Sequence, residues 1–388
     1  MKNPKDSLQK AANAFGMDKL KPFQKKVCDV LLDGHDVIAL SGTGSGKSLC
    51  YQLPAYLHRN MLTIIITPVI ALMRDQKQRW PDDIHVQCLY HGNPENSLIY
   101  TLLKKKKLSV LYLSPERLAD PKICKALREN SIFMVVVDEV HCLMEWGNEF
   151  RPMYQQIGEF IRSCKPKPVI AAFSATVASD DIPFIVHSLG MQKYCLHVGK
   201  LYRKNLNLKK KFVKTDAIRY EKVQKAVLKY HKKGKIIIYC TTIRDVQDMY
   251  EYLVEECDLS KDEVAICHSK LSNRSLEEER FRSGKAKIMI ATSAFGMGID
   301  IPDIRLVIVS QMPFSITSFY QMVGRAGRDG KKAHGLLLYN DADVRMNLDI
   351  ISTEDERAIT AVDEMWNLCL SDEKIQTQVM DYFGWEEA

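Results

Sequence analysis

Short apolar runs bounded by turn residues recur along this chain, with helix-like stretches between them. Runs of four or five residues at such a spacing are typical of buried parallel strands in an α/β sheet. One series comprises residues 37–40, 62–66, 110–113, 133–137 and 169–173. A second comprises residues 236–239, 264–266, 288–290, 306–309 and 336–339. Two series of strands predict two sheets, and therefore two lobes of α/β type.

The segments between and after these series set the expected domain boundaries. Residues 199–206 are polar and show no sustained period, which favours a linker. Strand signals stop after about residue 345, and residues 354–370 and 373–382 have the pattern of amphipathic helices. We therefore expect a first lobe over 1–200, a second over 201–345 and a helical appendage over 346–388.

Composition excludes several classes of protein. The chain has 388 residues, of which 46% are hydrophobic, too many for a disordered chain. It has neither an apolar run of membrane-spanning length nor the apolar core of a signal peptide at its first residues. Its eleven cysteines are scattered, which favours reduced thiols. We expect a cytoplasmic (nucleoid) or nuclear protein that is neither secreted nor inserted in a membrane.

The charge is divided unevenly along the chain. Residues 349–388 carry eleven Asp and Glu against Arg357 and Lys374, a net charge of −9, so the rest carries +16 of the overall +7. A body this basic is compatible with a polyanionic partner or with an ordinary solvated surface.

A phosphate-binding loop follows the first strand. Residues 41–48 read Ser-Gly-Thr-Gly-Ser-Gly-Lys-Ser and open a helix-like run, which is the strand-loop-helix context of a P-loop, with Ser41 where the general pattern has Gly. Backbone N–H groups of Gly44, Ser45 and Gly46 would face phosphates. Lys47 would reach the terminal phosphates and the Ser48 hydroxyl would meet Mg²⁺.

An acidic pair follows a wholly apolar strand. Asp138 and Glu139 come directly after residues 133–137, at the carboxyl end of a buried strand, where α/β sheets place ligand chemistry. Asp138 would hold the Mg²⁺ that accompanies ATP, and Glu139 would orient the attacking water. Together with Lys47, the pair predicts hydrolysis of a nucleoside triphosphate.

The second lobe offers a pair of arginines beside glycines. Arg325 and Arg328, in the run from Gln321, are three residues apart and are expected on one helical face. They could stabilise a transferring phosphoryl group, or they could pair with structural carboxylates. In the first case the nucleotide would lie between the lobes.

Over residues 15–345 the order of these segments resembles the superfamily-two helicases, and most closely the RecQ DNA helicases. Seven segments resemble the helicase motifs. In chain order they are residues 44–48 (motif I), 67–76 (motif Ia), 114–118 (motif Ib), 138–141 (motif II), 174–176 (motif III), 294–300 (motif V) and 321–328 (motif VI). The resemblance implies two RecA-like lobes. It assigns Lys47, Asp138, Glu139, Gln321, Arg325 and Arg328 to catalysis, and Arg74, Arg117, Ser174 and Thr176 to DNA binding or coupling.

Residues 144–154 resemble the aromatic-rich loop that separates RecQ proteins from RNA helicases. In the family it couples single-stranded DNA to ATP hydrolysis, which here implies Trp146, Phe150, Arg151 and Tyr154. Aromatic rings and a guanidinium suit base stacking and backbone contact, although aromatic residues on a helix are more often part of a core.

Residues 21–24 resemble the adenine-recognition motif, with Gln24 reading the base edge. Three residues depart from the family's pattern. Lys21 stands where the family has Arg, and Asn148 stands where it has His. Asp300, which the resemblance assigns to nucleotide binding, stands where many members have Asn. Lysine lacks the planar surface of a guanidinium, so looser adenine selectivity is expected.

Residues 382–384 resemble part of the RecQ zinc subdomain, but the expected first cysteine ligand is replaced in the stretch 374–376. Beyond Asp349 the only thiol or imidazole is Cys369, so we expect no zinc. The two helices would instead pack through Ile350, Ile359, Met365, Trp366, Leu370, Val379, Tyr382 and Phe383.

The resemblance implies an ATP- and Mg²⁺-dependent DNA helicase of 3′→5′ polarity, acting in DNA repair or recombination on single-stranded and partly duplex DNA, and expected as a monomer. Three alternatives stay open: a strand-annealing or remodelling motor that does not unwind, a binding protein whose ATPase gates release, and an RNA helicase.

Overall fold

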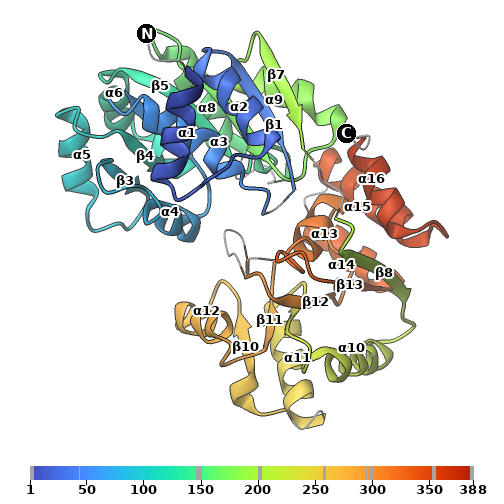
Figure 1. Cartoon of the computed structure of the whole chain (residues 1–388). Coiled ribbons are helices and arrows are strands. Elements are labelled where there is room, and N and C mark those ends of the chain that lie inside the picture. Colours follow the sequence, from blue (N-terminus) through green and yellow to red (C-terminus); the bar gives the residue numbers. More distant parts are fainter. Residues whose placement is uncertain are drawn as a thin grey trace. The chain divides into compact units, whose positions relative to one another are not determined.

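The computed structural model describes residues 4–42, 44–145, 151–199, 203–256, 259–293, 295–296, 301–351 and 355–384; of residues 4–6, 145 and 151–155 it describes the backbone alone. The chain divides into two compact units, Met1–Leu201 and Tyr202–Glu386. In Figure 1, unit 1 runs from blue to light green and unit 2 from dark green to red. Both units are α/β, as the two series of apolar runs predicted.

Unit 1 contains a parallel sheet whose described strands follow the order β3-β4-β2-β5-β6-β1-β7. The strands are β1 (Asp36–Leu40), β2 (Leu62–Ile66), β3 (Val86–Leu89), β4 (Val110–Leu113), β5 (Ile132–Asp138), β6 (Val169–Ser174) and β7 (Tyr194–Val198). Strands β5, β6 and β1 are neighbours, with Val135 opposite Ile170 and Val37 opposite Ala171. The loops that follow these three strands therefore converge at one edge of the sheet.

Helices cover this sheet and connect its strands. They are α1 (Pro4–Ala14), α2 (Pro22–Leu32), α3 (Lys47–Leu57), α4 (Ile70–Lys77), α5 (Asn96–Lys104), α6 (Pro121–Arg128), α7 (Cys142–Glu145), α8 (Arg151–Ser163) and α9 (Ile182–Leu189), with short 3-10 turns at Pro115–Ala119 and Ser179–Asp181. Helix α3 lies against β5, and α1 and α2 pack on α3.

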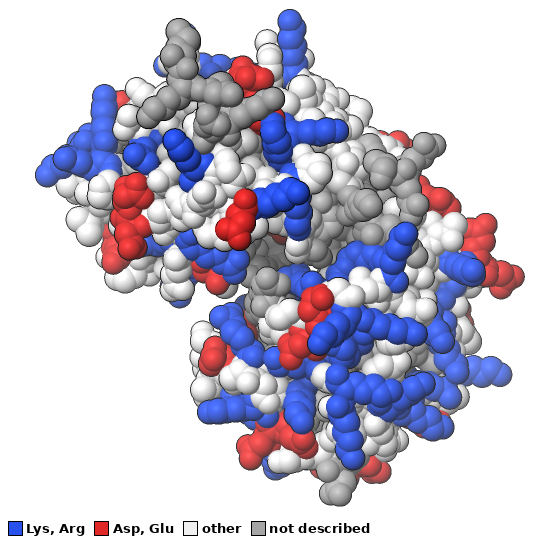
Figure 2. All heavy atoms as spheres, viewed as in Figure 1, with Lys and Arg blue, Asp and Glu red and all other residues white. Residues whose placement is uncertain are grey.

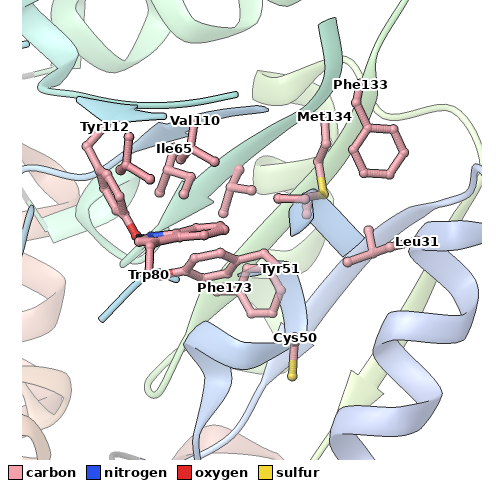
Figure 3. Close-up of a cluster of buried hydrophobic side chains, with 14 of the residues drawn as sticks. Leu31, Cys50, Tyr51, Ile65, Trp80, Val110, Tyr112, Phe133, Met134 and Phe173 are labelled. Atoms are coloured by element: carbon pink, nitrogen blue, oxygen red, sulfur yellow. Dashed lines mark hydrogen bonds between the residues drawn. The ribbon is translucent and has the colours of Figure 1, made fainter. Parts of the chain in front are cut away.

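The core of unit 1 combines aliphatic strand residues with aromatic side chains from strands, from α3 and from the segment after α4. Tyr51 of α3 packs edge-to-face on Phe173, with ring centroids 5.1 Å apart, and the Trp80 indole donates to the Tyr112 hydroxyl at 3.1 Å. Figure 3 shows these four side chains gathered on one side of the sheet. The core therefore includes Tyr51 of the helix that follows the P-loop, whose hydroxyl lies 3.1 Å from Asp138 Oδ2.

Unit 2 contains a second parallel sheet, of described order β10-β11-β9-β12-β13-β8. Its strands are β8 (Leu206–Phe212), β9 (Lys235–Tyr239), β10 (Val264–Cys267), β11 (Ile288–Ala291), β12 (Ile304–Val309) and β13 (Ala333–Tyr339). Its helices are α10 (Asp216–Tyr230), α11 (Ile243–Glu256), α12 (Arg274–Ser283), α13 (Ile316–Val323), α14 (Asp341–Ile350), α15 (Glu356–Leu370) and α16 (Ile375–Phe383), with a 3-10 turn at Lys261–Glu263.

The structure adds three strands that the apolar runs did not predict: β3, β7 and β8. All three are edge strands in their sheets. Strand β8 includes Lys209, Lys210 and Lys211, which were interpreted as a basic stretch after a linker. An edge strand is only half buried, so it alternates apolar and polar residues and lacks the continuous apolar run of a central strand.

The C-terminal helices α15 and α16 belong to unit 2 and pack on it. Met365, Val379 and Phe383 are fully buried as predicted, and Trp366 contacts the Tyr339 ring. Burial of each large apolar side chain contributes about 1.5–3 kcal/mol. The prediction was wrong for Ile350 and Leu370, which are 54% and 57% exposed because they end α14 and α15 and point away from the packed face.

Candidate active site

The P-loop of unit 1 is built around two left-handed glycines. Gly44 and Gly46 have φ of 78° and 87°, and a Cβ atom at Gly46 would lie only 2.5 Å from the Gln24 side chain. The backbone can therefore curl tightly between β1 and the first residue of α3, Lys47. Ser41, the departure from the general pattern, is buried, and its N–H donates to the Ser174 carbonyl at 3.1 Å.

The P-loop side chains point into the loop itself. The Lys47 ammonium donates to the Ser41 carbonyl at 2.6 Å and to the Gly42 carbonyl at 3.4 Å. Among the side-chain atoms that the structure describes, Ser45 Oγ is buried without a hydrogen-bond partner. A buried unpartnered hydroxyl beside a lysine and a helix N-terminus fits an anionic oxygen ligand such as a phosphate.

Lys21 and Gln24 lie against the P-loop. The Lys21 ammonium donates to the Ser45 carbonyl at 2.9 Å, and Gln24 Nε2 donates to the Gly46 carbonyl at 3.1 Å. Gln24 Oε1 accepts from the Lys21 backbone N–H, and the side chain is 1% exposed. Both polar ends of the Gln24 amide are therefore used within the protein: Oε1 caps the start of α2, and Nε2 joins α2 to the P-loop.

Asp138 and Glu139 lie where β5 ends. Asp138 is buried, and Glu139 adopts a left-handed φ of 54°, an unusual conformation for a residue with a side chain. Burial, and then the neighbouring Glu139 carboxylate, raise the pKa of Asp138 to about 6, while Lys47 acts in the opposite direction. A cation beside Asp138 would favour the ionised form of its carboxyl group.

Motifs II and III meet through a histidine. His141 Nδ1 lies 3.3 Å from Glu139 Oε2 and 3.0 Å from Ser174 Oγ. The Thr176 N–H donates to Ser174 Oγ at 3.1 Å, and both Ser174 and Thr176 are buried. Both side chains are therefore enclosed within unit 1, and their assignment to DNA binding or coupling stays a prediction.

A buried polar network that the sequence reasoning missed connects Ser48 to Asp138. Gln76 Nε2 donates to Ser48 Oγ at 3.2 Å, and the Tyr51 hydroxyl lies 2.8 Å from Gln76 Oε1 and 3.1 Å from Asp138 Oδ2. Both predicted magnesium ligands are thus joined by two residues from α3 and α4. Gln76 ends the segment that resembles motif Ia, but neither Gln76 nor Tyr51 was assigned a role, because core packing explains the pattern of each helix.

Arg74 and Arg117 lie elsewhere in unit 1. The Arg74 guanidinium donates to the Tyr90 hydroxyl at 2.6 and 3.0 Å and lies over the Tyr90 ring. Arg117 Nε, among the atoms described, is buried without a hydrogen-bond partner.

In unit 2, Gln321 lies within α13, but Arg325 and Arg328 follow it. The prediction that both arginines share a helical face was wrong: α13 ends at Val323, and residues 324–329 form turns because two glycines, Gly324 and Gly327, interrupt the helix. Arg325 Nη1 donates to the Gly296 carbonyl, and Gly296, at a φ of 101°, leaves no room for a side chain beside Arg325.

Two residues of the expected linker hold this arginine turn. Arg203 donates to the Gly324 carbonyl at 2.7 Å and to the Ala326 carbonyl at 2.8 Å, and it also bonds the Gly327 carbonyl. Asn205 donates to the Gly327 carbonyl at 2.7 Å. Sequence reasoning missed both residues because a polar segment without a period favours a linker.

Several predicted site residues cannot be placed. Trp146, Phe150 and Asp300 lie outside the described residues, as do the side chains of Arg151 and Tyr154. In the part of the chain that the structure describes, no three His, Cys, Asp or Glu residues are arranged to hold a metal ion by themselves, and no helix has the length and apolarity that crossing a bilayer requires.

The fold and the site together define a P-loop protein with two parallel-sheet units. The DEAD/DEAH box helicase family matches residues 21–182, and the helicase conserved C-terminal domain matches residues 218–330. The "Probable ATP-dependent DNA helicase RecS" of Bacillus subtilis is 31% identical over 380 residues, which cover 95% of this chain and 73% of that protein. The "ATP-dependent DNA helicase RecQ" of Synechocystis is 33% identical over 349 residues, 87% of this chain and 72% of that protein.

The chain belongs to the RecQ family of ATP-dependent DNA helicases and contains the helicase core of that family. The fold is shared more widely. The solved structure of S. cerevisiae Dbp5 bound to RNA and ADP BeF3 superposes with a TM-score of 0.70 at 18% identity, over 98% of this chain and 97% of that one. Two RecA-like units are therefore common to this chain and to more distant helicases.

Proposed function

We propose that this chain hydrolyses ATP to move along single-stranded DNA with 3′→5′ polarity and to separate partly duplex DNA, in repair or recombination. The proposal rests most on one observation, the network from Ser48 through Gln76 and Tyr51 to Asp138. It links the P-loop, the motif Ia helix and the motif II carboxylate through buried hydrogen bonds, so a contact made at one of these segments can reach the others.

Within unit 1, Lys47 binds the terminal phosphates, and the N–H groups of Gly44, Ser45 and Gly46 surround them. Lys21 and Gln24 hold the P-loop from the side of the base. Ser48 and Asp138 offer the hard oxygen ligands that Mg²⁺ prefers, and a bound Mg²⁺ would neutralise charge on the phosphates. Glu139 accepts a proton from the attacking water, and His141 orients its carboxylate.

Within unit 2, Arg325 and Arg328 supply positive charge to the transferring phosphoryl group, and Gln321 contributes from the preceding helix. Arg203 and Asn205 act as positioning residues, because they bind the backbone of the arginine turn rather than a substrate. Asp300 completes the nucleotide contacts. DNA binding is coupled to ATP hydrolysis by Trp146, Phe150, Arg151 and Tyr154, together with Arg74 and Arg117.

The proposal is tested by ATPase turnover measured without nucleic acid, with single-stranded DNA and with RNA of the same sequence. We expect strong stimulation by DNA and weak stimulation by RNA. Glu139→Gln should retain nucleotide binding and lose hydrolysis, because an amide fills the same space but cannot take up a proton. Equal stimulation by RNA would reassign the substrate, and loss of ATP binding in Glu139→Gln would assign Glu139 to holding the metal.

A further inference from the structure

A group of lysines gathers on unit 2 outside the motifs used above. This lysine patch consists of Lys209, Lys229, Lys232, Lys233 and Lys332, all of them exposed. Lys209 lies on the edge strand β8, three of the others lie where α10 ends, and Lys332 lies in the turn before β13. Figure 2 shows Lys and Arg side chains covering the part of unit 2 that holds α10 and β8.

These lysines converge on one side chain, His334 of β13. Burial lowers the pKa of His334, and the charges of Lys332, Lys209, Lys229 and Lys233 lower it further. Four ammonium groups from three separate elements are therefore near one imidazole. Convergence from several elements distinguishes the patch from a run of lysines on one solvated helix.

Two of the ammonium groups are held over an aromatic ring. Lys233 Nζ lies 4.8 Å and Lys229 Nζ 5.8 Å from the centre of the Tyr230 ring, and that ring lies 5.1 Å from the His334 ring. Cation–π contacts restrict long side chains that would otherwise sample many rotamers. The positive charge is partly preorganised before any ligand arrives.

The patch is also not neutralised within the protein. Over the described residues none of its five lysines forms an ion pair, whereas Lys225, Lys235 and Arg305 of the same unit pair with Glu221, Asp303 and Asp329. Lysines at a helix end also stabilise the helix dipole, which accounts for residues near the end of α10. That effect does not explain Lys209 and Lys332, which belong to other elements.

The patch lies on the opposite face of the sheet from the arginine turn. His334 contacts Tyr230 of α10, whereas the next residue along β13, Gly335, faces Val323 of α13 and Leu208. Successive residues of a strand point to opposite faces, so α10 with the patch and α13 with the arginine turn cover different sides. Substitution of the patch lysines should therefore weaken a function of this surface without lowering ATP hydrolysis.

We propose that the lysine patch is a second nucleic-acid-binding surface, which contacts the phosphate backbone of DNA without reading its sequence. Lysine ammonium groups suit phosphate oxygens, and binding of this kind releases counterions and weakens steeply with salt. An acidic protein segment could be attracted by the same charge. Nucleic acid is favoured because the chain belongs to a family of DNA helicases, whose substrate brings a regular row of phosphates.

The test compares two triple variants of equal charge. Lys229→Gln/Lys233→Gln/Lys332→Gln removes three charges from the patch, and the control Lys261→Gln/Lys285→Gln/Lys287→Gln removes three exposed charges from the other end of the same sheet. Binding of labelled single-stranded and duplex DNA is followed by fluorescence anisotropy over NaCl concentrations of about 50 to 200 mM. The slope of the logarithm of the DNA association constant against log [NaCl] is negative. Its magnitude should decrease by about 2 to 3 in the patch variant, since each phosphate contact contributes about 0.7–0.9.

We expect about tenfold weaker DNA binding by the patch variant in mid-range salt, with basal ATPase and melting temperature equal to those of the control variant. The corresponding Lys→Arg triple keeps the charge and should keep the slope. Equal slopes in the two Gln variants would overturn the proposal. So would loss of binding to poly-glutamate with DNA binding unchanged, which would assign the patch to an acidic protein.

Discussion

The P-loop region of unit 1 and the arginine turn of unit 2 are fixed by different kinds of contact. In unit 1, side chains bond to side chains, from Ser48 through Gln76 and Tyr51 to Asp138. In unit 2, Arg203 and Asn205 bind the backbone carbonyls of the turn. A side-chain network transmits a change in one member to the others, whereas a backbone clamp fixes the path of the turn. We therefore expect unit 1 to respond to small changes far from the phosphates.

The largest effect is expected at Lys47. Lys47→Ala should lower ATP turnover at least about 100-fold, because the variant loses the charge that stabilises the phosphates during transfer. Melting temperature should change little, since Lys47 is only partly buried and its ammonium donates to carbonyl groups of the P-loop. Lys25→Ala is the control, since this exposed lysine of α2 pairs with Asp29. Turnover that is near normal in Lys47→Ala would contradict the assignment of the P-loop.

Tyr51→Phe tests the side-chain network with the loss of one oxygen. We expect roughly tenfold lower kcat and a higher Mg²⁺ requirement, because the change removes the hydroxyl that lies between Gln76 and Asp138. Tyr112→Phe makes the same change at another buried tyrosine, whose hydroxyl accepts from Trp80. Equal losses in the two variants would mean that the Tyr51 hydroxyl serves the core alone.

Arg203→Ala tests the backbone clamp of unit 2. We expect kcat to fall by about five- to tenfold with little change in nucleotide affinity, because the arginine turn loses three carbonyl contacts while the P-loop is untouched. Arg203→Lys should recover only part of the loss, since a single ammonium nitrogen cannot replace the two guanidinium nitrogens that donate to separate carbonyl groups. An increase in KM at unchanged kcat would place Arg203 in nucleotide binding instead.

The last test concerns stability instead of turnover. The pKa of Asp138 is raised in the folded protein from 3.8 to about 6, so the ionised carboxylate destabilises the ligand-free fold above that pH. Asp138→Asn should therefore raise the melting temperature at pH 8, and the difference from the unmodified chain should shrink as the pH falls from 6 to below 4.

Asp36→Asn provides a contrast to this variant. The Asp36 carboxylate accepts from the Ile170 N–H at 2.8 Å and lies beside Lys167, so its replacement should lower the melting temperature. A melting temperature that falls in Asp138→Asn, or a difference that does not depend on pH, would contradict the destabilising role of the Asp138 carboxylate. Differential scanning fluorimetry across this pH range provides the measurement.

The central strands and the P-loop could be predicted from sequence because their residues have one dominant constraint. Residues 133–137 are apolar because both faces of β5 are buried, and the glycines of the P-loop are required by its curvature. The edge strand β8 was not predicted because half of it faces solvent and carries lysines. The arginine turn was mistaken for helix because three-residue spacing fits both structures until the glycines end α13.

The positioning residues were beyond sequence reasoning for a different reason. Tyr51 and Gln76 come from separate helices, and Arg203 meets its partners more than a hundred positions later in the chain. Each is an ordinary residue in its local pattern, and its role arises only when the fold brings distant segments together. Buried side-chain networks of this kind are the part of a site that local sequence patterns do not encode.

We propose that ATP hydrolysis by this chain drives separation of DNA strands. The most direct measurement is fluorescence unwinding of a partial duplex with a single-stranded 3′ tail, compared with the same duplex carrying a 5′ tail, alongside DNA-stimulated ATPase in the same reaction. We expect ATP-dependent separation of the 3′-tailed duplex, and none with Lys47→Ala. ATPase that is stimulated by DNA without separation of either duplex would contradict the claim and favour an annealing motor or a gated binding protein.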